Sequence, residues 1–335
     1  LGDVLHRNRP IGAEVIDAIG RIGGFPRGEF IRLDGIAPEV QAPIRIAIEP
    51  VVTVLALIVD GDVSLSCGLR GVDGSVILLD PDFRYKIPLE TLKKEVLGRG
   101  LKALLASNPC NPTGQLVEGA ELQRWVQLAR RYRVSLILDE FYSHYIYTGR
   151  PEESPKLVSA AAYVEDVNTD PVILVDGLTK GWRYPGWRIS WTVGPKEVIN
   201  TISSAGSFLD RGANNPFQPQ VLQLLDPEQV VEDTASTQNY FRRKRDYLLE
   251  RLYGMGVGVE AEPEGTFYVW ANLEQLPEPL NDGLQFFKEG LNENVITVPG
   301  IFFDVNPERR RTYARYHKYC RISFGPGMPA LEQGL

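Results

Sequence analysis

Residues Val175–Gly194 read VDGLTKGWRYPGWRISWTVG and set a single lysine between two β-rich apolar runs, 172–175 and 189–193. A lysine between two buried strands can be desolvated, which favours the neutral, nucleophilic form of Lys180. Arg188 offers a fixed fork of donors that suits a phosphate. The stretch is equally compatible with a surface loop that carries two solvated charges, so its interpretation depends on the rest of the chain.

Composition narrows the class of protein. The chain has 335 residues, which corresponds to roughly two domains, and its 43% hydrophobic and 24% charged residues are typical of a soluble globular protein. A net charge of −7 without a basic block argues against nucleic acid as a partner. No stretch reaches ~18 uninterrupted apolar residues, so no membrane span is expected, and no signal peptide is visible at the start.

Cysteine and histidine usage points to a compartment and argues against a metal. Three cysteines, Cys67, Cys110 and Cys320, are odd in number and widely spaced. This pattern is typical of the reducing cytoplasm and not of a disulfide framework or a zinc site. With only three histidines in the chain, histidine-rich metal chemistry is not expected.

The hydrophobic pattern predicts an α/β fold. Strands alternate with helices through the middle of the chain, which predicts a mainly parallel sheet covered on both faces. Later strands and helices predict a smaller α+β domain, so we expect a large domain at 45–225 and a small domain at 1–44 and 226–335. The expected strands are 30–34, 63–67, 75–80, 103–107, 134–139, 172–175, 189–193, 266–273, 295–299 and 320–325, and the expected helices are 13–22, 90–97, 119–131, 195–204 and 236–252.

Several polar groups follow the predicted parallel strands. In open α/β sheets the ligand binds beyond the carboxyl ends of the strands. Ser66–Gly68, Asn111, Asp139 with Tyr142, and Lys180 all occupy such positions. Their coincidence predicts a ligand site more strongly than any one of these groups does.

One connection is too short for this fold. Cys67 and Ser75 bracket only seven residues, whereas a parallel crossover needs ~10–12 or more. Either the protein has lost the connection or the sequence lacks segments of the natural chain, and we expect the latter. Gaps between consecutive α-carbons well above 3.8 Å near this point would support it.

Two further stretches hold polar side chains at strand ends. Ser107–Gly114 reads SNPCNPTG, in which two X-Pro steps and a closing glycine hold Asn111 in a turn directly after a strand. The alternative is a plain Asn-Pro turn. Asp139 ends a buried strand, where a carboxylate is unfavourable unless it meets a cation; the alternative is a helix cap or a paired structural acid.

Together these stretches resemble the fold-type I pyridoxal-phosphate enzymes of the class I/II aminotransferase group. The matching pieces occur in the family's order and span most of the chain. GTFYVW at 265–270 is similar to the family's small-domain strand. The resemblance implies a large domain with an aspartate-aminotransferase-like sheet that binds pyridoxal 5'-phosphate. The four matching pieces are NPCNPTG at 108–114, DEFY at 139–142, TKGWRYPGWRIS at 179–190 and YCRISFG at 319–325.

The resemblance implies a role for each matching residue. Lys180 would attach the cofactor through a Schiff base and then move the α-proton as a general base. Asp139 would pair with the protonated pyridine nitrogen, which keeps the ring an electron sink. Asn111 and Tyr142 would hydrogen-bond the ring's phenolate oxygen, and Arg188 would bind the phosphate.

Further positions are expected to contact substrate or cofactor. Arg321 would hold the substrate α-carboxylate with a bidentate pair, with Asn111 and the turn at Gly35 nearby. Phe83, in DPDF, would stack on the pyridine ring, with core packing as the alternative. Cys67 and Gly68 fall where the family has a glycine-rich loop whose backbone N–H groups hold the phosphate.

The sequence also departs from the family's pattern. Three residues before the lysine the family commonly has a serine on the phosphate, but here the residue is Gly177, which leaves Thr179 as the hydroxyl of this turn. The partner-subunit tyrosine that usually reaches the phosphate is not identifiable. The segment 210–216, DRGANNP, resembles one donated across the dimer interface. If Asp210 faces the site, it would favour a cationic substrate side chain such as a guanidinium.

These expectations lead to one main function and to alternatives. The main expectation is amino-group transfer between an amino acid and a 2-oxo acid by a cytoplasmic homodimer. A lyase, cyclase or racemase with the same cofactor, for example one that acts on an arginine-like amino acid, would use every residue named for cofactor binding. A ligand-sensing domain without turnover is a third possibility, although such regulators usually carry a DNA-binding segment. A dinucleotide site is excluded because no G-x-G-x-x-G follows the first strands.

Overall fold

The computed structural model describes residues 86–99, 101–150, 155–209, 213–304 and 312–335. Several expectations therefore lie outside the described residues. These are the elements expected before residue 86, the short connection between Cys67 and Ser75, the dimer-segment residue Asp210, and the site residues Gly35, Cys67, Gly68 and Phe83.

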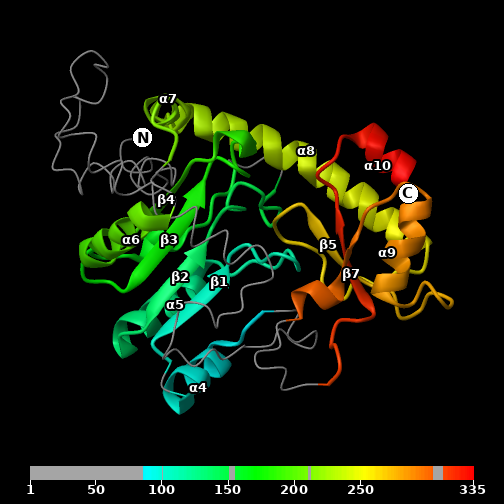
Figure 1. Ribbon diagram of the computed structural model, residues 1–335, viewed down its shortest axis with the longest axis horizontal. Coiled ribbons are helices and arrows are strands. Elements are labelled where there is room, and N and C mark those ends of the chain that lie inside the picture. Colours follow the sequence, from blue (N-terminus) through cyan, green and yellow to red (C-terminus); the bar gives the residue numbers. More distant parts are fainter. Residues whose placement is uncertain (1–85, 100, 151–154, 210–212, 305–311) are drawn as a thin grey trace.

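The larger of the two sheets in the described structure has four strands (Figure 1). Its order is β1-β2-β3-β4, with β1 (Ala103–Ser107), β2 (Ser135–Asp139) and β3 (Val172–Gly177) parallel to one another. The last strand, β4 (Ser190–Val193), runs antiparallel to β3. The helix α5 (Gly119–Tyr132) supplies the long crossover that a parallel pair needs, whereas the shorter link from β3 to β4 returns the chain antiparallel. The expected mainly parallel sheet is confirmed.

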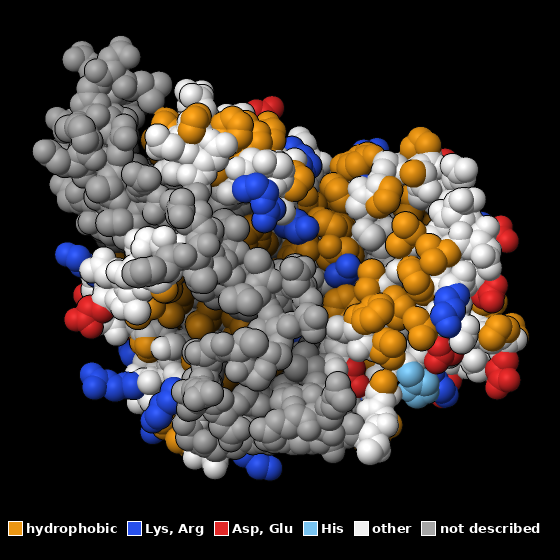
Figure 2. Space-filling view, viewed as in Figure 1, with side chains coloured by type: hydrophobic (Ala, Val, Ile, Leu, Met, Phe, Trp, Pro, Cys, Tyr) orange, Lys and Arg blue, Asp and Glu red, His pale blue; other side chains and the backbone are white. Residues whose placement is uncertain are grey.

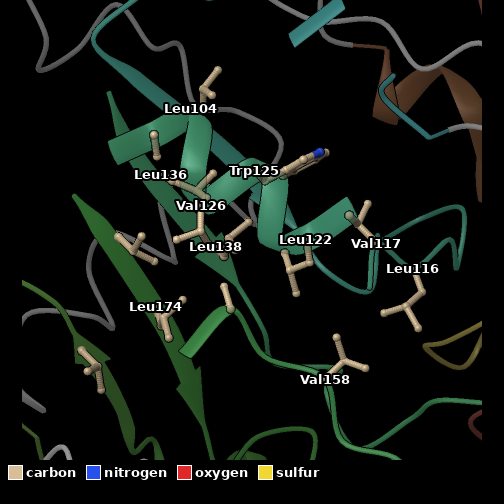
Figure 3. Packing of buried hydrophobic residues seen from close by; sticks show 14 of the residues in the cluster. Leu104, Leu116, Val117, Leu122, Trp125, Val126, Leu136, Leu138, Val158 and Leu174 are labelled. Atoms are coloured by element: carbon tan, nitrogen blue, oxygen red, sulfur yellow. The ribbon is translucent and has the colours of Figure 1, made fainter. Parts of the chain in front are cut away.

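The hydrophobic core beside this sheet forms between the apolar face of α5 and the strand residues that point toward it. Every third or fourth residue of α5 is buried, and alternate residues of β2 are buried on the face that meets it. Figure 3 shows these side chains packed between helix and sheet. The helix contributes Leu122, Trp125, Val126 and Ala129, and the strands contribute Leu104, Leu136, Leu138 and Leu174.

A second, antiparallel sheet has the order β5-β7-β6. It consists of β5 (Tyr268–Asn272), β7 (Tyr319–Ser323) and β6 (Val298–Pro299). The strand expected at 295–299 is only two residues long. It ends at Pro299 as expected, before the short helix η5 (Gly300–Phe303), but it begins three residues late, because the Val295 N–H donates to the carbonyl of Gly290 at 2.7 Å instead of to a neighbouring strand.

The longest helix, α8 (Pro227–Gly254), extends from the side of the first sheet to the second (Figure 1). The Asp226 side chain accepts hydrogen bonds from the N–H groups of Glu228 and Gln229, and Pro227 occupies the first turn. An Asn/Asp/Ser cap followed by proline is a helix-start signal, so the helix begins well before the expected residue 236. The remaining helices within the described residues are α4 (Leu89–Arg99), α6 (Lys196–Leu209), α7 (Gln218–Leu224), α9 (Gly283–Asn292), α10 (Met328–Gly334), η3 (Ala160–Tyr163) and η4 (Pro185–Trp187).

One face of the molecule keeps hydrophobic side chains at its surface. Figure 2 shows them gathered over the part that carries the second sheet. Ile296, Phe302 and Tyr313 are the most exposed large hydrophobic residues of the described chain. Among the helices that the structure describes, none combines the length and the apolar character that crossing a membrane requires.

Backbone hydrogen bonds join the Asn-Pro loop to the segment that precedes β5. The N–H groups of Glu264 and Gly265 both donate to the carbonyl of Gly114, at 2.9 and 2.8 Å. The N–H of Thr266 donates to the carbonyl of Tyr145 at 2.9 Å. The segment before β5 therefore contacts loops that follow both β1 and β2, and it connects the two sheets.

We predict that Gly114→Ala destabilises the protein far more than Gly119→Ala. Both glycines have positive φ, 72° and 58°, and alanine costs about 1–2 kcal/mol there. A Cβ at Gly114 would also overlap Pro263, whereas nothing lies within 4 Å of a Cβ at Gly119. Overpacking adds about 1–3 kcal/mol. Urea unfolding should give a loss of about 3 kcal/mol for the first variant and about 1 kcal/mol for the second; equal losses would contradict the close packing of Gly114.

Candidate active site

Asp139 lies at the carboxyl end of β2 with its carboxylate partly buried. Its side chain accepts a hydrogen bond from the Phe141 N–H at 3.2 Å and forms no ion pair with any residue that the structure describes. Burial raises the pKa of Asp139 to about 6, although the hydrogen bond from Phe141 and the charge of Lys180 act in the opposite direction. Asp139 is therefore ionised at neutral pH, and the expected cation is not supplied by a direct ion pair.

Two further acids lie beside Asp139 in the sheet. Glu140 accepts a hydrogen bond from the Ala160 N–H at 2.9 Å, and burial raises its pKa to about 7. Burial also raises the pKa of Asp176 well above its usual range, and the charges of Glu140 and Asp139 raise it further. The raised pKa values favour the neutral forms of Glu140 and Asp176, so Asp139 is the carboxylate of the three that stays charged at neutral pH and suits a cationic group on a ligand.

Lys180 follows β3 at the level of these acids. Its Nζ lies 5.8 Å from the ring centre of Tyr142 and 5.7 Å from that of Phe267. The Tyr145 hydroxyl donates to the backbone carbonyl of Lys180 at 2.9 Å. Two aromatic rings therefore lie near the amine, and the Tyr145 hydroxyl holds the backbone of this turn.

The residue after the lysine packs against a buried histidine. A Cβ at Gly181 would lie 2.6 Å from Cδ2 of His144, so only glycine fits there. Burial lowers the pKa of His144 to about 4, and its Nδ1 lies 2.9 Å from the Thr234 hydroxyl of α8. A neutral histidine thus connects the lysine turn to the long helix.

Tyr142 points its hydroxyl at a residue of the second sheet. The hydroxyls of Tyr142 and Tyr268 lie 3.1 Å apart. Burial and the neighbouring Tyr268 raise the pKa of Tyr142 well above its usual value, against a smaller opposing effect of Arg321. Tyr142 is therefore a neutral hydroxyl donor at working pH.

Arg321 connects the second sheet to the loop after β1. Its Nη1 donates to Oδ1 of Asn111 at 2.8 Å, across 210 positions of sequence. The guanidinium carbon lies 4.1 Å from the ring centre of Tyr268 and 4.9 Å from that of Phe303. Its Nε is buried without a hydrogen-bond partner in the described structure. The unused N–H groups of Arg321 can therefore donate to an anion, and its expected contact with a substrate carboxylate stays a prediction.

Arg188 and Thr179 lie on either side of the lysine turn. Arg188 is exposed, has φ 54°, and donates from Nη1 to the Pro185 carbonyl at 3.3 Å. Thr179 is partly buried. Most of the donor groups of Arg188 thus remain available for a ligand, and its role in phosphate binding stays a prediction.

The structure adds residues that the sequence did not single out. They are Tyr145 and His144, which support the lysine turn, and Tyr268 and Phe303, which flank Arg321. Tyr268 lies within GTFYVW, which was assigned only as a strand. The closely spaced aromatic residues at 141–147 are the feature of the sequence that could have pointed to His144 and Tyr145.

A comparison with known protein families identifies the family of this chain. The family described as aminotransferase class I and II matches residues 67–330. The chain belongs to this family. Its members use pyridoxal phosphate.

Curated relatives carry aminotransferase names. A glutamate-pyruvate aminotransferase of Escherichia coli is 33% identical over 60% of this chain and 47% of its own length. A probable aspartate/prephenate aminotransferase of Aquifex aeolicus is 28% identical over 69% of this chain and 57% of its own length. The chain therefore spans about half the length of the curated relatives that it matches.

Solved structures show the same architecture. A Thermus thermophilus aspartate aminotransferase matches with a TM-score of 0.63 at 25% identity, over 76% of this chain and 60% of that chain. A tetra mutant of the same enzyme matches with a TM-score of 0.70 at 20% identity, over 97% and 83%. The expected aspartate-aminotransferase-like fold is confirmed.

The described residues fit the family's cofactor. Asp139 is a partly desolvated carboxylate without an ion pair among them, which suits a protonated ring nitrogen. Lys180 offers an amine beside aromatic rings. Arg188 keeps guanidinium donors for a phosphate, and the described part of the chain contains no group of ligands that could hold a metal ion.

We predict that Asp139→Asn stabilises the cofactor-free protein at neutral pH. A folded-state pKa raised from 3.8 to about 6 means that the folded protein binds this proton more tightly than the unfolded chain. Stability from this group is then full below about pH 4 and is lost as the pH rises to about 6. The gain from asparagine should be small at pH 4 and reach up to about 3 kcal/mol above pH 6.

Asp170→Asn is the matched control for urea unfolding at several pH values. Hydrogen bonds from Arg130, at 2.6 and 2.7 Å, hold the pKa of Asp170 below its usual value. Asparagine should therefore destabilise the protein at neutral pH, with a loss that shrinks in acid. A pH-independent effect of Asp139→Asn would contradict the raised pKa.

Proposed function

We propose that this protein is a pyridoxal-phosphate-dependent aminotransferase that exchanges amino groups between an α-amino acid and a 2-oxo acid. The observation that carries the proposal is the hydrogen bond from Arg321 to Asn111. It brings a guanidinium with unused donors from the second sheet to the loop beside Asp139, Tyr142 and the Lys180 amine. A carboxylate receptor, an amine and a carboxylate counter-ion then face one place, which is the set that amino-acid chemistry on this cofactor requires.

Six residues would hold the cofactor. Lys180 would carry the covalent attachment, Asp139 would receive the protonated ring nitrogen, and Asn111 with Tyr142 would donate to the ring's phenolate oxygen. Arg188 and Thr179 would contact the phosphate. The bound cofactor supplies an electron sink that stabilises a carbanion at the substrate α-carbon.

The chain's own groups would move the protons. Lys180 Nζ would take the α-proton and return it as general base and acid. The rings of Tyr142 and Phe267 lie near this Nζ. Asp139 stays ionised near neutral pH, so it can keep a proton on the group that it faces.

Arg321 would select substrates with an α-carboxylate. Its Nη1 is engaged with Asn111, and its stacking on Tyr268 leaves the edge of the guanidinium for a bidentate contact. The proposal does not specify the substrate side chain, because Asp210, the residue expected to favour a cationic side chain, lies outside the described residues.

The wider organisation is also part of the proposal. A large domain at 45–225 and a small domain at 1–44 and 226–335 are supported by the position of β1–β4 before residue 226 and of β5–β7 after it. A homodimer is proposed from family membership, with light scattering as its test. A cytoplasmic location is supported by Cys110 and Cys320, which are free thiols.

We predict that borohydride fixes the cofactor to Lys180. The reagent converts the reversible bond between a lysine and the cofactor's aldehyde into a stable amine, which peptide mass spectrometry locates. Lys180→Ala should show no adduct and should lose at least about a thousandfold of the activity, since the residue is both attachment point and proton carrier. An adduct on another lysine, or none in the wild type, would refute the proposed site.

Incubating the enzyme with amino acids and 2-oxo acids and identifying the products distinguishes amino-group transfer from the alternative reactions. Transfer yields the swapped amino acid and oxo acid. Release of a β- or γ-substituent, ring closure of an arginine-like amino acid, or loss of chirality without an oxo acid would instead indicate a lyase, cyclase or racemase.

We predict that Arg321→Lys lowers kcat/KM for amino acids about tenfold to a hundredfold. Lysine keeps the charge but loses the fork, which removes one charge-assisted hydrogen bond of about 1.5–3 kcal/mol. Arg243→Lys, on the exposed side of α8, should leave kcat/KM unchanged. A similar effect of both substitutions, or none for Arg321→Lys, would count against a carboxylate receptor at Arg321.

A further inference from the structure

Ser190 has a buried hydroxyl without a hydrogen-bond partner. The residue is 5% exposed, and its Oγ meets no donor or acceptor in the described structure. A buried polar group left unsatisfied costs about 1–3 kcal/mol, so each such group in a native structure calls for an explanation, and a bound group that accepts its hydrogen bond is one. Ser190 begins β4, two residues after Arg188.

The sheet register places Ser190 on the face that carries Asp139. Ser190 pairs directly with Gly177 of β3, and Val175 of the same strand pairs with Asp139. Register partners project to one face of a sheet, and so do residues two apart along a strand. The Asp139 carboxylate and the Ser190 hydroxyl therefore belong to one face at the same end of the sheet.

The distance between Asp139 and Ser190 suits a ligand with a cationic group at one end and an anionic group at the other. Two strand separations, about 10 Å, lie between β2 and β4. A cationic ring nitrogen at Asp139 would leave the other end of the ligand near β4, the turn of Thr179 and Lys180, and Arg188. An anion at that end would meet a guanidinium and a hydroxyl that needs an acceptor.

Gly177 explains why the hydroxyl lies on β4. A Cβ at Gly177 would lie 2.6 Å from the Ser190 Cα and 2.7 Å from its Cβ, closer than real side chains approach. The two strands thus leave room for one side chain at this pair, and here Ser190 supplies it. The family commonly has a serine at the position of Gly177, and in this chain the serine hydroxyl of the strand pair belongs to Ser190 instead.

We propose that Ser190 donates a hydrogen bond to the cofactor's phosphate, beside Arg188 and Thr179, and takes the place of the hydroxyl absent at Gly177. This inference rests on the proposed cofactor site. It makes Ser190 a binding residue with no part in proton transfer.

The test is Ser190→Ala in the full chain, with the loaded enzyme dialysed against a series of cofactor concentrations. Bound cofactor is read from its absorbance. The affinity for pyridoxal 5'-phosphate should fall about tenfold to a hundredfold, the effect of one hydrogen bond to a charged group. The affinity for pyridoxal, which lacks the phosphate, should stay at the wild-type value.

Thr297→Val is the matched control. Thr297 also has a buried hydroxyl without a partner, at 4% exposure, but it precedes β6 in the other sheet. This variant should bind both compounds as the wild type does. Ser190→Ala should also raise the thermal midpoint of the cofactor-free protein, because it removes a buried hydroxyl that makes no bond there, and should reduce the rise in midpoint that pyridoxal 5'-phosphate produces.

Three outcomes would overturn the inference. Unchanged affinity of Ser190→Ala for pyridoxal 5'-phosphate would exclude the hydrogen bond. An equal loss for both compounds, or a lower midpoint without cofactor, would indicate packing instead. If the wild type gains a borohydride adduct at Lys180 while Ser190→Ala binds normally, only this inference fails; without any wild-type adduct, the proposed function fails with it.

Discussion

The carboxylate of Asp139 is the constraint on which the site depends. It lies partly buried at the end of β2, accepts one hydrogen bond from the backbone, and forms no ion pair among the described residues. Burial opposes its charge more strongly than Lys180 supports it, and the pKa rises to about 6. A protein that keeps such a group lowers its own stability unless a ligand brings positive charge, and this is why a cofactor with a protonated ring fits.

Around this carboxylate the fold assembles groups from distant parts of the chain. The parallel strands β2 and β3 bring Asp139 and the lysine turn to one edge, because parallel strands end on the same side. The antiparallel sheet delivers Arg321 from the far end of the sequence. Close packing of backbone at Gly114, Gly181 and Gly177 allows these pieces to approach, and the small residue is a steric requirement at each of them.

The long helix α8 supports this assembly from behind. Thr234 contacts His144 beneath the lysine turn, and Thr237 accepts a hydrogen bond from Arg183 at 2.8 Å. Further along the helix, the buried Lys244 donates to the carbonyl of Gly325, just after β7, at 2.9 Å. Burial lowers the pKa of Lys244 to about 8. One helix therefore holds the lysine turn and the arginine strand in a fixed relation.

The sequence alone determined the residue types and their local positions. Lys180, Asp139, Asn111, Tyr142 and Arg321 stand in recognisable stretches, because turn residues and hydrophobic alternation act over a few neighbours. The strands β1 to β4 also followed from this pattern, with bounds within one or two residues.

Tertiary structure decided which side chains of the site contact one another. The bond from Arg321 to Asn111 spans 210 positions, and the pairing of Ser190 with Gly177 depends on a strand register. Neither follows from spacing, since a one-residue slip of register would turn the serine to the opposite face. The starts of β6 and α8 also depend on local hydrogen bonds that hydrophobic spacing does not reveal: the Val295 N–H bonds to the Gly290 carbonyl and delays β6, and the Asp226 cap begins α8 before its periodic stretch.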